Sequence, residues 1–258
     1  MRAYLFAGYY WIATVFYALS AVMLAALPGR RPMAGAIKHY TRRMIWGMRA
    51  LAGIEVQVKG KERLPKGAFI IAAKHHSWGD GFVLYSSVPN LTFVTGDHME
   101  KFPLIGGILR KMGAIIVDNC GGPEARQALA EQAATANAEG RRILIFPEGN
   151  LARPGEHFRY RTGVYFMAKD FDLPVVPVAT NLGCFWRQQD FAKTPGRATV
   201  EFLEPIPTGL EKDEFIARLQ SVIEARSQEL IAEATGGPVT SSLLVPTPDE
   251  LRKMAGRS

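Results

Sequence analysis

A histidine and an aspartate five residues apart are the residues of this sequence whose types and spacing best fit acid–base chemistry. His75 and Asp80 lie in the stretch KHHSWGD, residues 74–80. On one continuous helix, side chains five residues apart point about 140° away from each other, so they could not pair there. If His75 lies in a loop and Asp80 enters the following helix, the carboxylate can orient the imidazole. A histidine held in this way can take a proton as a general base.

Other chemistry at this position has less support from the motifs. The sequence has no G-x-S-x-G element, which argues against an α/β-hydrolase, and Ser77 is too close to His75 for an easy triad. No H-E-x-x-H motif or cysteine cluster indicates a metal site, and H-x-x-x-x-D is not a tight metal-binding spacing. One rival stays open, a metal-dependent phosphohydrolase that uses His75, His76, Asp80, Asp97 and His98. Loss of activity to a chelator would identify it.

The elements that must position His75 alternate between strands and helices. Short β-rich runs predict strands at 54–60, 68–73, 91–96, 113–119, 142–149, 174–180 and 198–206. Helix-like stretches lie at 81–88, 103–112, 123–140 and 162–171, and a last amphipathic helix starts near Asp213. This alternation predicts an α/β layer fold with a largely buried sheet. The strand at 68–73 would deliver His75 to the edge of that sheet.

The N-terminal residues are typical of a membrane-bound segment. No residue from Ala3 to Gly29 is charged, and a helix needs about 20 apolar residues to cross a bilayer. Arg30 and Arg31 follow at once, which predicts that the rest of the chain lies in the cytoplasm. Residues 34–53 read as a basic amphipathic helix suited to an interface with anionic lipid. The alternatives are a cleaved signal peptide, a helix lying in one leaflet, and packing of 34–53 on the soluble domain.

The charge is concentrated near the N-terminus. The chain carries a net charge of +7, and residues 1–66 hold eleven Lys or Arg but two acidic residues, so the remainder is slightly acidic. No aromatic–basic pattern resembles a nucleic-acid module, which favours an anionic membrane as the partner. The two cysteines, Cys120 and Cys184, form no disulfide framework and favour a reduced compartment. We expect membrane helices at 1–52, a catalytic domain at 53–235 and a loosely ordered tail at 236–258.

Four blocks, in order, resemble the glycerolipid acyltransferase family, and in particular its 1-acylglycerol-3-phosphate acyltransferases. KHHSWGD resembles the N-H-x-x-x-x-D block, and residues 100–119 resemble the second block. FPEGN (146–150) resembles F-P-E-G-T-R, and LPVVPVAT (173–180) resembles the V-P-V-type block. The similarity covers about residues 50–235. It implies a mixed sheet flanked by helices, and the hydrophobic N-terminal helices fit the bacterial members.

The resemblance implies transfer of a fatty acyl group from acyl-CoA or acyl carrier protein to the free hydroxyl of a lysolipid, most commonly lysophosphatidic acid. It implies no metal or other cofactor, and a place at the inner, cytoplasmic membrane with the catalytic domain facing the cytoplasm. By resemblance His75 is the base and Asp80 its partner, with His76 a neighbour or surface residue. Glu148 and Gly149 match the acceptor-site block. Lys74 replaces the usual asparagine, which we treat as a lesser variation.

Two arginines through which the family contacts the acceptor phosphate are missing. Asn119 and Leu151 stand at their positions. The candidate replacements are Arg153, Arg159 and Arg161, of which Arg161 matches a commonly basic position. Because phosphate favours a bidentate guanidinium, the acceptor can differ from lysophosphatidic acid. The alternative acceptors are lyso-ornithine lipid and another lysophospholipid. The missing arginines also leave open a non-catalytic protein that only binds lipid.

Overall fold

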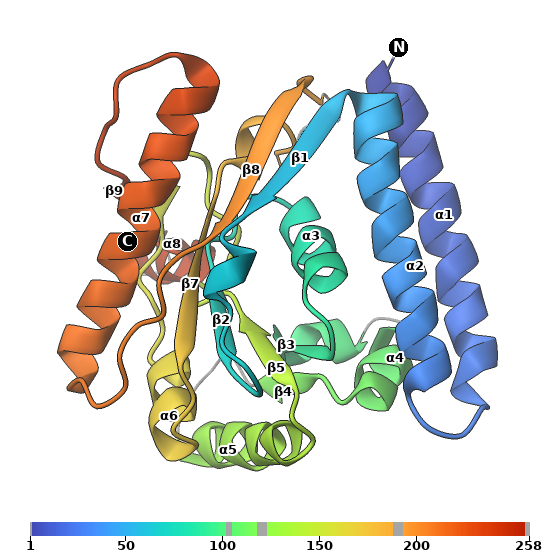
Figure 1. Cartoon of the computed structure of the whole chain (residues 1–258), viewed down its shortest axis with the longest axis horizontal. Helices are drawn as coiled ribbons and strands as arrows, with labels where there is room; N and C mark the ends of the chain where they lie inside the picture. The colour runs from blue at the N-terminus through green and yellow to red at the C-terminus, as the bar shows by residue number, and fades with distance from the viewer. Residues whose placement is uncertain (1, 102–104, 118–122, 188–192, 256–258) are drawn as a thin grey trace.

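A seven-stranded sheet forms the centre of the computed structural model, which describes residues 2–101, 105–117, 123–187 and 193–255 (Figure 1). The strands follow the order β1-β8-β7-β2-β5-β3-β4. They are β1 (Ile54–Lys59), β2 (Ile70–Ala73), β3 (Leu91–Gly96), β4 (Ile115–Val117), β5 (Arg142–Ile145), β7 (Val175–Thr180) and β8 (Gly196–Phe202). Neighbouring strands run parallel except for the antiparallel pair β7–β8. The predicted mixed α/β sheet is confirmed, and all seven predicted strands are present.

Helices cover both faces of this sheet. On one side α7 (Lys212–Thr235) packs with α5 (Pro123–Ala138) and α6 (Gly163–Asp170). On the other side α3 (Gly79–Ser87) lies between the sheet and the pair α1 (Arg2–Ala25) and α2 (Arg31–Gly47) (Figure 1). The remaining helical elements are η1 (Met48–Ala52), η2 (Lys61–Arg63), η3 (Asp97–Lys101), α4 (Ile105–Met112), η4 (Leu182–Cys184) and α8 (Pro248–Ala255).

The central strand β2 divides its side chains between two hydrophobic clusters, because successive residues of a strand point to opposite faces. Ile71 and Ala73 join the cluster on the α3 side, which also includes Phe6 of α1. Ile70 and Ala72 join the cluster on the side of α5, α6 and α7. All four β2 side chains are fully buried. This burial on both faces explains why the strand reads as a continuous apolar run.

The two N-terminal helices pack as an antiparallel hairpin against the rest of the molecule. Phe6 is buried and meets the ring of Trp186 edge-on at 5.1 Å. Further along α1, the Thr14 hydroxyl lies 2.8 Å from the Tyr40 hydroxyl of α2. Helix α1 therefore contacts the folded domain through Phe6 and packs along α2.

The outward face of α1 is strongly apolar. Its exposed large hydrophobic residues are Tyr4, Leu5, Trp11, Ile12, Val15, Phe16, Leu19, Val22 and Met23. Within the described residues, α1 is the one helix whose length and apolar composition would suffice to cross a membrane.

The segment after α7 contacts the loop that follows β5. Helix α7 ends at Thr235 and is capped by Gly236, which adopts the left-handed conformation that favours glycine. Beyond it, β9 (Leu243–Leu244) pairs in parallel with β6 (Glu156–His157). The amide of Leu243 donates to the Gly155 carbonyl at 2.8 Å. The C-terminal residues thus support the loop that carries the candidate acceptor-binding arginines.

Candidate active site

The candidate site lies where three neighbouring strands end. In the sheet, β2 is flanked by β5 and β7, and both run parallel to it. Their carboxyl ends therefore meet at one edge, the usual location of ligand sites in sheets of this kind. His75 follows β2, Phe146 and Glu148 follow β5, and Asn181 follows β7.

His75 and Asp80 are in contact, as the sequence predicted. The Nδ1 atom of His75 lies 3.2 Å from Oδ2 of Asp80. Asp80 is in the first turn of α3, whereas His75 lies in the loop before it, so the chain folds back between them. The same Oδ2 atom accepts the backbone N–H groups of His76 and Ser77, each at 2.8 Å. The turn itself therefore holds the buried carboxylate in place.

The imidazole of His75 is packed on one face and open at its edge. It stacks on the ring of Phe146, with 3.8 Å between ring centroids and 16° between planes. About a sixth of the side chain is exposed, 17%. Because Nδ1 donates its proton to Asp80, Nε2 is left as the basic nitrogen. The arrangement can remove a proton from a hydroxyl group; the catalytic roles of both residues stay predictions.

His76 is buried, so the expectation of a surface position is wrong. It is 1% exposed, and its Nδ1 atom lies 3.2 Å from the Thr180 carbonyl oxygen. Since a carbonyl only accepts hydrogen bonds, Nδ1 carries the proton. Burial, and next the positive charge of Lys74, hold the pKa of His76 well below its ordinary value. His76 is thus a neutral internal residue, adjacent to the base and turned away from it.

Glu148 lies inside the molecule. Its side chain is fully buried, and Oε2 accepts the backbone N–H of Phe158 at 2.9 Å and the ammonium of Lys74 at 3.1 Å. The Oε1 atom faces the backbone N–H of His75 at 3.5 Å. Burial raises the pKa of Glu148 to about 7, opposed by the charge of Lys74. In this geometry Glu148 contacts the protein around His75, and its predicted role in acceptor binding stays untested.

Sequence reasoning missed the part that Lys74 and Glu224 play in this region. The Lys74 ammonium lies 2.8 Å from Oε1 of Glu224, a residue of α7. The Tyr160 hydroxyl donates to the same oxygen at 2.8 Å. One signal was available for Lys74, since it continues the alternation of β2 toward the α7 side. No local pattern identifies its partner, which lies 150 residues away in the chain.

The loop after β5 brings exposed arginines to the same edge of the sheet. The Ala152 amide donates to the His75 carbonyl at 2.9 Å, so this loop covers the backbone of the base. Gly149 is exposed and has a φ angle of +67°, and the guanidinium of Arg161 lies against it. Arg153 is exposed in the same loop. Asn119 lies outside the described residues.

One observation concerns the metal-dependent phosphohydrolase. Within the described parts of the chain, no three His, Cys, Asp or Glu residues are grouped so that they could hold a metal ion.

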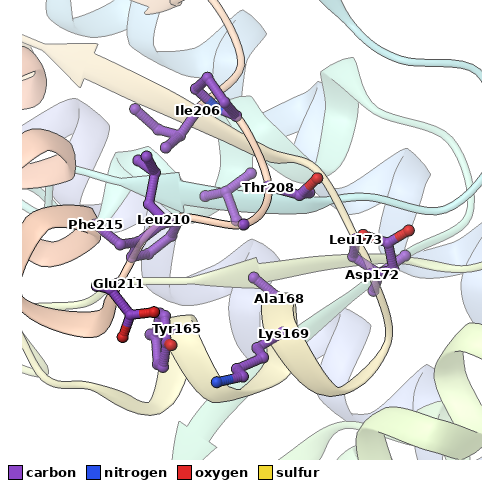
Figure 2. A pocket seen from close by; sticks show the side chains of 13 residues that line it. Tyr165, Ala168, Lys169, Asp172, Leu173, Ile206, Thr208, Leu210, Glu211 and Phe215 are labelled. Carbon is purple, nitrogen blue, oxygen red and sulfur yellow. The ribbon is translucent and has the colours of Figure 1, made fainter.

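A cavity of about 210 Å³ lies between α6 and the segment from Ile206 to Phe215 (Figure 2). Val175, the first residue of β7, lines it, so the cavity is at the opposite edge of the sheet from His75. It is not part of the candidate site.

Known proteins resemble this chain in sequence. The model of the Acyltransferase family matches residues 55–181. The 1-acyl-sn-glycerol-3-phosphate acyltransferase of Pseudomonas aeruginosa is 30% identical over 236 residues, covering 92% of this chain and 91% of that relative. The relative of the same name from Saccharomyces cerevisiae is 28% identical over 206 residues, covering 78% of this chain and 67% of its own.

A solved structure shares the fold. The crystal structure of the 1-acyl-sn-glycerophosphate (LPA) acyltransferase PlsC from Thermotoga maritima matches with a TM-score of 0.71 at 20% identity. The match covers 90% of this chain and 98% of that one. The structural match shows the shared fold, and the 30% identity to the Pseudomonas relative over most of both sequences shows that the chain belongs to the acyltransferase family.

Proposed function

We propose that this protein transfers a fatty acyl group from acyl-CoA or acyl carrier protein to the free hydroxyl of a lysolipid, with 1-acylglycerol-3-phosphate as the first candidate acceptor and phosphatidic acid as the product. The observation that carries the proposal is the contact of His75 Nδ1 with Asp80 Oδ2 at the carboxyl edge of the sheet. The names of the relatives from Pseudomonas and yeast support the same acceptor.

The proposed reaction needs one proton to move twice. Nε2 of His75 takes the proton of the acceptor hydroxyl as its oxygen attacks the thioester carbonyl. Asp80 stabilises the imidazolium that forms. The new C–O bond replaces the C–S bond, and the imidazolium returns the proton to the departing thiolate. No acyl-enzyme is required, and every atom of the two substrates is accounted for in the ester and the free thiol.

Arg161 is the best-placed candidate for the acceptor phosphate. Its guanidinium lies against the exposed Gly149, and the residue before Gly149 is Glu148, which faces the backbone N–H of His75. Arg159, by contrast, lines a hollow beside α7 together with Asp213 and Gln220. A guanidinium can hold two phosphate oxygens at once, which suits a lysophospholipid with a terminal phosphate.

We place the protein at the inner face of the cytoplasmic membrane. The exposed apolar face of α1 supports this placement, as do the exposed basic residues of the adjoining helical segment, Arg42, Arg43 and Arg49. Apolar side chains insert into the acyl region, and arginines attract anionic headgroups. Because α1 packs along α2 and against Trp186, an α1 that lies in one leaflet fits the fold better than one that crosses the bilayer.

A different lysolipid is the second candidate acceptor. Leu151 stands where the resembled motif has an arginine, and an apolar side chain contributes nothing to phosphate binding. Lyso-ornithine lipid or another lysophospholipid would depend less on a second guanidinium. The acceptor question is separate from the acyl-transfer chemistry at His75.

One experiment tests both points. The purified full-length protein is incubated with acyl-CoA or acyl carrier protein donors and a panel of lysolipids, and the products are identified by mass. We expect phosphatidic acid from lysophosphatidic acid, with equal yield in EDTA. A large preference for lyso-ornithine lipid would replace the acceptor, whereas release of monoacylglycerol from lysophosphatidic acid that stops in EDTA would favour the metal-dependent phosphohydrolase. Failure to acylate any lysolipid would refute acyl transfer.

A further inference from the structure

The residue before the candidate base is a lysine with no solvent exposure. Lys74 is 0% exposed and follows β2, the central strand of the sheet. Lysine is almost never fully buried unless it is paired, because removing an ammonium from water is costly. Its burial therefore requires partners, and those partners must be held in the right geometry.

All three hydrogens of this ammonium are used. Nζ lies 3.1 Å from Oε2 of Glu148, 2.8 Å from Oε1 of Glu224 and 2.9 Å from the carbonyl oxygen of Glu156. An ammonium has three donors, so three separate acceptor groups saturate it. The two carboxylates come from different parts of the chain, since Glu148 follows β5 and Glu224 is in α7.

At the end of β2, the side chains of Lys74 and His75 lie on opposite faces of the sheet. The Lys74 amide still donates to Val178 of β7 at 2.9 Å, so the strand geometry continues to this residue. The Lys74 side chain then points toward α7, and that of His75 points toward Asp80 in α3. A displacement of one side chain is thus transmitted to the other through the shared backbone.

Glu148 contacts both the ammonium of Lys74 and the backbone of His75. One of its oxygens accepts from Lys74, and the other faces the backbone N–H of His75 at 3.5 Å. Glu148 has no contact with water through which it could relax, because it is fully buried. The position of the His75 backbone therefore depends on where Lys74 and Glu224 hold the Glu148 carboxylate.

We propose that Lys74, paired with Glu224 of α7, is a positioning residue that fixes His75 against Asp80 through the carboxylate of Glu148. The inference deepens the proposed acyl transfer and rests on it for its kinetic test. It also gives α7 a part in catalysis, although α7 packs on the face of the sheet opposite α3 (Figure 1).

The test compares a change within the network of Lys74, Glu148, Glu224 and His75 with a change outside it. Lys74→Met keeps a long unbranched side chain but removes the ammonium that holds Glu148. Thr92→Val removes a 2.8 Å hydrogen bond from a buried hydroxyl to the Gly113 carbonyl, and Thr92 contacts none of the four residues of the network through a described hydrogen bond. It therefore serves as the matched control for a purely structural loss. Both variants are measured well below their melting temperatures, in the full-length protein.

We expect the kinetics of these two variants to differ. In Lys74→Met, kcat falls by about 10- to 100-fold with KM for donor and acceptor unchanged, because a misplacement of about 1 Å near the chemistry has effects of this size. In Thr92→Val, kcat stays within about twofold of wild type while the melting temperature falls. Equal losses of kcat in the two variants, or an unchanged kcat in Lys74→Met, overturn the proposal.

A second readout does not depend on the substrate. In protein labelled with ¹⁵N-histidine, the backbone amide resonance of His75 shifts in Glu224→Gln, which leaves the neighbouring residue 74 unchanged, and stays in place in Thr92→Val. If wild type acylates no lysolipid, the proposed function fails, and the resonance alone decides the positioning role. If Lys74→Met does not fold, Glu224→Gln replaces it, and an unmoved His75 resonance together with wild-type kcat rejects the proposal.

Discussion

The guanidinium of Arg161 occupies the space in which a side chain at Gly149 would begin. A Cβ atom at Gly149 would come within 2.8 Å of Nε and 2.9 Å of Cζ of Arg161. Gly149 also has a φ angle of +67°, a conformation that residues with a side chain rarely adopt. The glycine thus permits both the turn after Glu148 and the close approach of the arginine.

Gly149→Ala is expected to weaken acceptor binding by displacing Arg161. We expect KM for lysophosphatidic acid to rise by about tenfold, the effect of losing part of a charge-assisted contact. Gly155→Ala is the matched control, because Gly155 has a φ angle of +89° but no atom within 4 Å of an added Cβ. Both variants carry backbone strain, so an equal rise of KM in both would show that strain alone is responsible. Initial rates over a range of acceptor concentrations provide the measurement.

Arg161→Ala is expected to affect the acceptor and to leave the donor alone. If Arg161 binds the phosphate, KM for lysophosphatidic acid rises by about 10- to 100-fold, as for a lost charged hydrogen bond, while KM for acyl-CoA is unchanged. Arg159→Ala, which removes the arginine beside α7, should leave KM for lysophosphatidic acid and KM for acyl-CoA close to their wild-type values. The assignment of Arg161 is wrong if Arg159→Ala has the larger effect on acceptor KM.

His75→Ala is expected to abolish most of the transfer. General-base catalysis contributes about 10²–10⁴-fold, so kcat should fall by that factor. His98→Ala serves as the control, because His98 is exposed on η3 and lies outside the site. Product formation is followed by mass under saturating donor and acceptor. A His75→Ala protein as active as wild type would remove His75 from the mechanism.

Glu148 should give the folded protein a pH-dependent stability. Its pKa rises from 4.5 to about 7 on folding, chiefly because burial penalises the carboxylate. Between about pH 4.5 and 7, Glu148 in the folded state therefore holds a proton that it has lost in the unfolded state. Its stabilising contribution is complete below about pH 4.5 and disappears as the pH rises through about 7.

Glu148→Gln removes this titration while keeping the size of the side chain. From pH 5 to 7, wild type should lose stability relative to the variant by at most about 1.4 kcal/mol per pH unit, the limit for one proton. The free energy of unfolding, measured with denaturant in one detergent at each pH, checks this. Glu62→Gln, at an exposed position, should run parallel to wild type. If the Glu148→Gln curve is also parallel, Glu148 does not titrate in this range.

Replacing apolar residues on the outer face of α1 should release the protein from membranes. Ile12, Val15 and Leu19 are each more than half exposed. Full burial of such side chains contributes about 1.5–3 kcal/mol each, so changing all three to Ser should lower partitioning into vesicles by about 100-fold or more. The control changes Leu243, Leu244 and Leu251 to Ser, an equal apolar loss in the C-terminal segment. Equal release of both variants from sedimented anionic vesicles would argue against α1 as the anchor.

Local patterns were sufficient to predict the strands and the central pair of the site. The apolar runs that end in turn residues correspond to β1 through β5, β7 and β8, because each run is long enough to be a buried strand. The contact between His75 and Asp80 also followed from local reasoning, since a helix that begins near Asp80 forces the chain to fold back.

The features that could not be predicted depend on contacts between residues far apart in the sequence. Lys74 looked like a minor change because Glu224, which neutralises it, comes from α7 and is adjacent only after folding. The two-residue strands β6 and β9 are too short to produce a pattern, and each exists only because the other is nearby. His76 was expected to be a neighbour of the base or a surface residue, and its burial could not be predicted because its partner, the Thr180 carbonyl, lies at the end of β7.

The packing of Phe6 in the core has a consequence for how substrate reaches the enzyme. Since α1 is fixed to the catalytic domain, no flexible tether separates the proposed membrane-binding face from His75. An anchored enzyme of this build samples its acceptor by lateral diffusion in two dimensions. Its rate then depends on the mole fraction of lysolipid in the bilayer surface, and diluting the acceptor with inert lipid slows it even when the bulk concentration is constant.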